Sequence, residues 1–265
     1  MAHYLNGTAA TEQDLIDDLD SFLVNNVGWT LIDTVTDTGS DNDRVYFRQG
    51  TNGLRDMYVR WRGTGNQIRV YGYSLWVSSG QNSDEIHNSS NTVINVGSSS
   101  LNYWFFGDAH WCWVIVQNGD NSNYYSCFGG FCNSYYNSSD DDLPLAVAGM
   151  GSNTYTFESD RLYMYSPVIS GTPIKYESLD AVSSSLLVYS SPNTRDGSFG
   201  FLPIITYTDI TGHFEVRGEL PGIFQANGAG LSTQSFITIS GTTEQVFIVK
   251  HSSNTNTYGF GPIPV

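Results

Sequence analysis

The chain has 265 residues, of which 40% are hydrophobic and only 14% are charged, and its formal net charge is −15 at pH 7. This length and apolar content are enough to form a substantial core without a metal or disulfide to hold it together. The acidic balance argues against nucleic-acid binding, which needs a positively charged surface. The sequence has no apolar run of about 18 residues and no basic and apolar start, so neither a membrane span nor a signal peptide is expected.

Residues 1–28 predict an acidic helical segment that precedes the rest of the chain. Thr11 and Asp14 have the spacing of a capping box, and apolar residues follow at helical spacing until Gly28. Residues 1–43 contain nine acidic residues and no lysine or arginine. Acidic side chains in the first turns of a helix suit the positive end of its dipole.

From Trp29 onward the hydrophobic period changes to two, which is typical of strands. We therefore expect a mainly β fold, an antiparallel sandwich or barrel-like architecture with one short N-terminal helix. Residues 29–265 form the predicted β-rich domain, with a candidate subdomain junction at 170–197, where prolines and a serine run occur. The expected strands are 29–35, 44–48, 57–62, 68–75, 92–96, 103–106, 111–116, 124–128, 146–150, 161–165, 199–206, 213–216, 235–239 and 245–250, and the apolar tail 258–265 is expected to pack against the body.

Alternation in the strands 44–48, 57–62 and 68–75 predicts one core face and one polar face. The expected core face carries Val45, Phe47, Met57, Val59, Trp61, Ile68 and Val70, and the opposite face carries Arg44, Tyr46, Arg48, Tyr58, Arg60, Arg62, Arg69, Tyr71 and Tyr73. Arginine and tyrosine are enriched where proteins contact one another, and complementary charge steers association. We therefore predict a subunit interface at Arg44, Arg48, Tyr58, Arg60, Arg62, Arg69 and Tyr71, facing an acidic surface of a neighbour, for which the acidic helix of another copy is a candidate. The alternative is a solvated face that only raises solubility.

The segment 103–136 contains twelve aromatic residues, three of the six tryptophans and all three cysteines. It predicts three strands separated by turns at Gly107-Asp108 and 118–121, with apolar residues on both strand faces. Such a meander must lie at the centre of a β structure, covered on both sides. The residues expected in its core are Trp104, Trp111, Trp113 and Phe128.

Cys112, Cys127 and Cys132 are odd in number, so at least one thiol is free or pairs with another chain. A Cys127–Cys132 disulfide is one alternative, but we favour three buried free thiols because the cytoplasm keeps thiols reduced. The sequence His110-Trp111-Cys112 fits a strand better than half a metal site. The acidic turns at 37–43 and 118–122 lack the closing glutamate of a calcium loop, so no metal or cofactor is expected.

Several segments resemble, in the same order, a pattern found in tailed-bacteriophage virion proteins. They are Tyr103–Asp108, Trp113–Gln117, Tyr125 to Gly130, Leu143–Leu145 before Gly149, His213–Phe224, Phe247–Val249, and Arg44–Arg48 with Asp56–Val59. Together they cover most of residues 29–250, and the chain departs from the pattern at Gly107-Asp108, His110 and the cysteines. The resemblance implies a structural part of the tail, neck or baseplate, and it carries no catalytic residue to this chain.

The expected function is therefore that of a non-enzymatic virion component, made in the host cytoplasm, that contacts other copies of itself and other virion proteins. The sequence has no GxSxG, P-loop, GxGxxG or HExxH motif. Exposed tyrosine, tryptophan and asparagine can also stack on sugar rings, which leaves a phage adhesin that binds a host-surface glycan as the alternative. A glycan-cleaving enzyme is a third reading, although no spacing singles out a pair among the 26 acidic residues.

Overall fold

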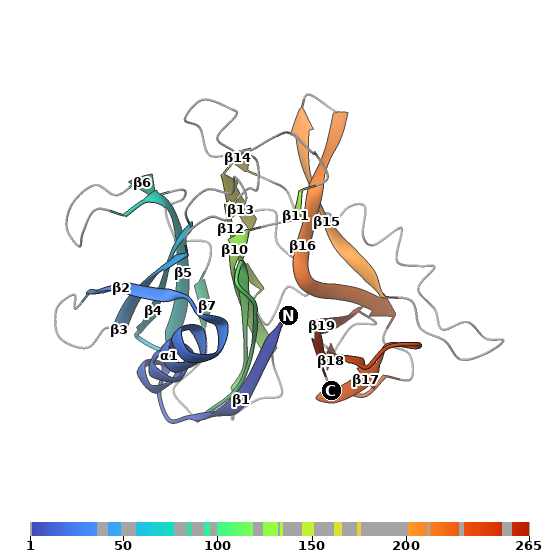
Figure 1. Cartoon of the computed structure of the whole chain (residues 1–265), viewed down its shortest axis with the longest axis horizontal. Helices are drawn as coiled ribbons and strands as arrows, with labels where there is room; N and C mark the ends of the chain where they lie inside the picture. The colour runs from blue at the N-terminus through green and yellow to red at the C-terminus, as the bar shows by residue number, and fades with distance from the viewer. Residues whose placement is uncertain are drawn as a thin grey trace.

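The computed structural model describes residues 2–35, 42–48, 57–76, 84–85, 93–95, 100–118, 124–131, 133–134, 145–150, 162–165, 174–175, 201–210, 213–227, 231–250 and 256–264. Three antiparallel sheets, which we name A, B and C, are stacked side by side with sheet A in the middle (Figure 1). The part of the chain that the structure describes has one short α-helix, continued by a π-helical turn, which packs at the edge of the layer between sheets A and B (Figure 1). The mainly β, sandwich-like fold predicted from the sequence is confirmed.

Sheet A contains the aromatic meander. Its strand order is β1 (His3–Ala9), β8 (Leu101–Gly107), β9 (Trp111–Asn118), β10 (Tyr124–Phe131), β12 (Leu145–Met150), β13 (Leu162–Tyr165) and β14 (Ile174–Lys175). Strand β1 was not predicted, and it pairs along its whole length with β8, from His3 opposite Gly107 to Ala9 opposite Leu101. The start of the chain is therefore built into the central sheet.

Sheets B and C cover the two faces of sheet A (Figure 1). Sheet B has the order β2 (Thr30–Val35), β3 (Asn42–Arg48), β4 (Met57–Thr64), β5 (Gln67–Leu75) and β6 (Asp84–Glu85), and β7 (Val93–Asn95) also pairs with β5. Sheet C has the order β11 (Asn133–Ser134), β16 (His213–Asn227), β19 (Asn256–Pro264), β18 (Glu244–Lys250) and β17 (Ser235–Thr238), and β15 (Leu202–Ile210) pairs with β16. The apolar tail of the chain is thus strand β19, and its Phe260 is buried.

Two core layers result from the alternation along β8, β9 and β10. The layer between sheets A and B includes Tyr103, Phe105, Cys112, Val114, Cys127, Val59, Trp61 and Val70. The layer between sheets A and C includes Trp104, Phe106, Trp111, Trp113, Phe128, Phe247 and Phe260. All four tryptophan and phenylalanine residues predicted for the core are buried in this second layer, with Trp113 and Phe128 fully inaccessible.

Gly129 shows how closely sheets A and B approach each other. A Cβ atom at this position would lie 2.8 Å from a methyl carbon of Val59 and 3.1 Å from one of Val70. A side chain on Gly129 would push the two sheets apart, so a glycine is needed for close packing at this point of β10.

The predicted helix is present as α1 (Glu12–Ser21), followed by the π-helical turn η1 (Phe22–Val27). It ends at Gly28, whose φ of 82° is readily adopted only by glycine. Leu15, Ile16 and Leu19 are fully buried in the layer between sheets A and B. None of the helices in the described part of the chain has the length and apolarity needed to cross a lipid bilayer.

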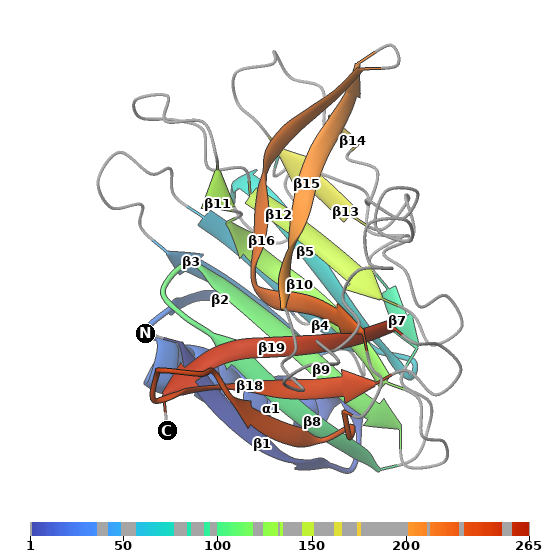
Figure 2. The same ribbon diagram turned by 90° about the vertical axis from the view of Figure 1, so that its right-hand side faces the viewer.

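Strands β15 and β16 form a long hairpin that extends beyond the stacked sheets (Figure 2). Their register shifts twice, between Pro203 and Ile204 and between Thr206 and Tyr207. Such irregularities bend a strand pair and increase its twist. Apart from β14, the candidate subdomain junction at 170–197 lies outside the described residues.

Candidate functional site

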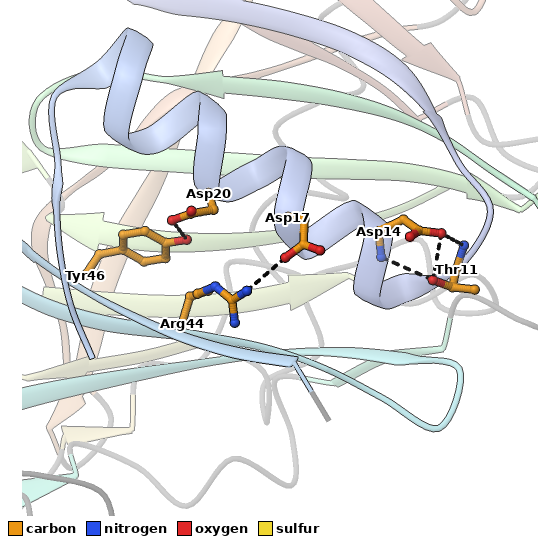
Figure 3. Close-up of polar contacts among 6 residues, drawn as sticks. All are labelled: Thr11, Asp14, Asp17, Asp20, Arg44 and Tyr46. Carbon is orange, nitrogen blue, oxygen red and sulfur yellow. Dashed lines mark hydrogen bonds and ion pairs between the residues drawn. The ribbon is translucent and has the colours of Figure 1, made fainter. Parts of the chain in front are cut away.

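The acidic residues of α1 make contacts within the chain (Figure 3). Thr11 and Asp14 form the predicted capping box, in which each side chain accepts a hydrogen bond from the other residue's backbone N–H at 3.1 Å. Asp17 forms an ion pair of 2.9 Å with Arg44 of β3. Asp18 accepts a 2.8 Å hydrogen bond from the Tyr103 hydroxyl, and Asp20 accepts one of 2.9 Å from the Tyr46 hydroxyl. The helix acids are therefore used to fix α1 against sheets A and B.

The face assignment of β3 predicted from the sequence is wrong. Arg44 lies directly opposite Trp61, and Tyr46 lies opposite Val59, so both belong to the inner face that packs on sheet A and α1. Alternation within one strand does not determine which face turns inward when both faces carry large side chains. Here the inner face accepts Arg44 and Tyr46 because α1 supplies carboxylates for their polar ends.

Burial changes the acid–base behaviour of the two tyrosines bound to α1. Burial raises the pKa of Tyr46 far above its usual value, and the neighbouring Asp20 carboxylate raises it further. The pKa of Tyr103 is raised in the same way, by burial first and then by its hydrogen bond to Asp18. Both hydroxyls therefore remain protonated donors at any ordinary pH.

The outward face of sheet B carries a group that we name the arginine face: Tyr58, Arg60, Arg62, Arg69, Tyr71 and Tyr73. Arg62 lies directly opposite Arg69 on the neighbouring strand, and Arg60 lies opposite Tyr71. The three arginines are only partly buried. Three cationic side chains are thus gathered on one face of a chain whose net charge is −15.

Not every residue predicted for the interface lies on the surface. Tyr71 and Tyr73 are 6% and 3% exposed, and their rings stack with centroids 6.5 Å apart. The guanidinium carbon of Arg60 lies 5.0 Å from the centre of the Tyr71 ring, a cation–π contact. Tyr71 is therefore packed inside the chain, contrary to expectation. Arg44 also belongs to the interior contacts, while the side chain of Arg48 lies outside the described residues.

A cavity of about 330 Å³ lies where the turn between β8 and β9 meets sheet C. Its lining combines carboxylates and an amide with aromatic and proline rings, and includes Asp108, Trp111, Asn133, Glu219, Phe224 and Glu244. Gly222 of β16 packs directly against the Trp111 indole at the cavity wall. The volume is at the lower end of the range of about 300–1,000 Å³ that is typical of small-molecule sites.

Three polar side chains of the cavity, those of Asp108, Asn133 and Glu219, take part in hydrogen bonds. One carboxylate oxygen of Asp108 accepts the backbone N–H groups of His110 and Trp111, at 2.7 and 3.2 Å, which fixes the turn before β9. The side-chain amide of Asn133 donates to a carboxylate oxygen of Glu219 at 3.1 Å. Among the described residues, no group of three or more histidine, cysteine or acidic side chains is arranged to hold a metal ion.

This cavity was not predicted from the sequence. Asp108 and Trp111 stood out only as a turn and a core tryptophan, and Glu219 and Glu244 come from strands more than 100 residues further along the chain. At Gly107-Asp108 the sequence differs from the pattern that it otherwise resembles, and Asp108 lines the cavity. The cavity is created by packing sheet C against the end of sheet A, which no local pattern encodes.

Two of the three cysteines are described, and both are buried free thiols. Cys112 and Cys127 lie on adjacent strands in the layer between sheets A and B. Burial raises the pKa of both thiols, and for Cys112 the nearby Cys127 adds to the effect. The free thiols of Cys112 and Cys127 agree with the prediction made for these two cysteines. Cys132 itself lies outside the described residues.

The scan against protein-family models and the search of curated proteins both found no match to this chain.

Proposed function

We propose that the chain is a structural component of a tailed-bacteriophage particle, located in the tail, neck or baseplate. It acts through contacts with other copies of itself and with other virion proteins, and the proposal assigns it no catalytic activity. The ordered series of segments that resemble virion proteins, from Arg44–Arg48 to Phe247–Val249, supports this assignment.

The observation that carries the assembly part of the proposal is the arginine face. Arg62 and Arg69 are direct cross-strand neighbours, and like charges in that position repel each other. In this proposal, an acidic surface on a neighbouring subunit is attracted to this concentration of positive charge, which sets the orientation of docking. Because the chain has a net charge of −15, other copies of it supply acidic surface in abundance.

The experiment that tests this proposal locates the chain in purified particles. Mass spectrometry of density-purified particles, with gold-labelled antibodies against the chain in electron microscopy, is expected to find it at symmetric positions on the tail, neck or baseplate. Finding the chain only in the infected-cell lysate, and not in washed particles, would overturn the proposal.

A further inference from the structure

We propose that the cavity between the β8–β9 turn and sheet C binds a neutral, polyhydroxylated ligand of the sugar class. This inference goes beyond the proposed structural role, since a virion component can build the particle whether or not it binds a sugar. It rests on the chemistry and arrangement of the cavity lining.

The lining has both kinds of group that a sugar ring needs. Phe224, Pro203 and Pro262 are at least partly exposed and supply apolar surface for the C–H faces of a ring, while the buried Trp111 forms the wall behind them. Asp108, Glu219 and Glu244 supply carboxylate oxygens that accept hydrogen bonds from hydroxyl groups, and Asn133 adds an amide. Hydrogen bonds to charged acceptors are stronger than those between neutral groups.

The rigidity of these groups supports a site for a ligand. The Asp108 carboxylate is oriented by two backbone N–H groups, one of which belongs to Trp111, three residues further along the chain. Glu219 is oriented by its hydrogen bond from Asn133. Acceptors that are already positioned lose little conformational entropy when a ligand binds.

The negative charge of the cavity lining disfavours anionic ligands. The described residues that line the cavity include three carboxylates and no lysine or arginine, so this part of the lining repels sialic acids, uronic acids and phosphates. The same carboxylates do not form a group arranged for a metal ion within the described part of the chain. Acceptors spread around a cavity instead suit a ligand with several separated donors, which is the pattern of a neutral sugar.

The test uses the intact chain on an array that contains neutral, acidic and amine-bearing glycans. The strongest neutral hit is then titrated by calorimetry with wild type and with two isosteric variants, Glu219→Gln and Glu244→Gln. Each variant removes one charged acceptor at a partly or fully exposed position, so the fold is expected to survive. Asp17→Asn serves as the matched control, because it makes the same chemical change on α1, away from the cavity lining.

We expect binding to neutral glycans, weakened by about tenfold in each glutamine variant and unchanged in Asp17→Asn. The proposal is overturned if no neutral glycan binds or if both glutamine variants bind as tightly as wild type. Binding confined to amine-bearing or acidic ligands also overturns it. None of these outcomes affects the location of the chain in the particle, so the two proposals fail independently.

Discussion

The buried Trp113 makes aromatic contacts through its ring and a hydrogen bond through its indole N–H. Its ring centre lies 4.9 Å from that of Phe128 and 5.5 Å from that of Phe260, which joins sheets A and C. Its indole N–H donates a 2.7 Å hydrogen bond to the buried carbonyl of Pro221. The side chain therefore connects the aromatic meander to β16 and β19 at a single point.

Replacing Trp113 with alanine is expected to lower the free energy of unfolding by about 3–5 kcal/mol, the usual cost of emptying a large core site. The orphaned Pro221 carbonyl adds to this loss. Trp113→Phe is the control, because it keeps most of the ring contacts and should cost clearly less. Urea melts of the three proteins measure the effect, and a loss below about 1 kcal/mol for the alanine variant would show that this core layer is wrongly placed.

Stability should fall in alkaline solution because the buried thiols and hydroxyls must stay protonated in the fold. In the unfolded chain, cysteine loses its proton near pH 8.5 and tyrosine near pH 10. The folded pKa values of Cys112, Cys127, Tyr46 and Tyr103 are raised, so between the unfolded and folded values the unfolded state binds fewer protons. The stability from these groups is fully present below about pH 8 and is lost as the pH rises above that.

The measurement is the urea midpoint at a series of pH values between 7 and 10.5. The urea midpoint of wild type is expected to fall from about pH 8.5 onward. A Cys112→Ala/Cys127→Ala variant should be less stable at neutral pH, but its urea midpoint should begin to fall only near pH 10. Identical pH profiles for the two proteins would mean that the thiols are not buried in the fold.

At the scale of elements, the capping box shows what local sequence can specify. Thr11 and Asp14 are three residues apart, and both reciprocal hydrogen bonds are present in the structure. The signal was readable because the cap, the first helical turn and their partners all lie within one short segment. The face that β3 turns inward was not readable, because it depends on Asp17 and Asp20 of α1, more than 20 residues earlier in the chain.

Thr11→Ala should destabilise the chain by about 1 kcal/mol, the typical cost of losing an N-cap side chain. Thr8→Ala is the matched control, since Thr8 is an exposed residue of β1 and does not cap a helix. Thermal melts followed by circular dichroism provide the comparison. Equal melting temperatures for the two variants would show that α1 does not depend on its cap.

At the scale of the whole molecule, the sequence predicted the central position of the aromatic meander but not the order of the layers. Large apolar residues on both faces of β8, β9 and β10 required cover on two sides, and the structure supplies it with sheets B and C. Strand β1 was missed because its short mixed pattern, His3 to Ala9, is stabilised by pairing with β8, almost 100 residues away. The cavity was missed for the same reason, since it arises from contact between distant strands.

The structure also shows which partners several charged side chains have within the chain. Asp17 and Arg44 neutralise each other within the fold, and Asp18 and Asp20 accept hydrogen bonds from tyrosine hydroxyls of the same chain. Arg60, Arg62 and Arg69 lie on the other face of sheet B, where Arg60 contacts the Tyr71 ring and Arg69 donates hydrogen bonds to Gln67. The proposed interface is therefore reduced to the partly exposed members of the arginine face, Tyr58, Arg60, Arg62 and Arg69.

The most direct test of this account is sedimentation velocity of wild type and of the double variant Arg60→Glu/Arg62→Glu, at low and at high salt. Single exposed charge pairs contribute only about 0–1 kcal/mol, so two reversals are used. Arg44→Glu is the control, because it reverses a charge on the inner face and should lower stability without changing assembly. We predict that wild type forms a homo-oligomer that weakens with salt, and that the double variant, shown by circular dichroism to be folded, is shifted toward monomer at low salt. A folded double variant that assembles with unchanged affinity at low salt would contradict the proposed role of the arginine face.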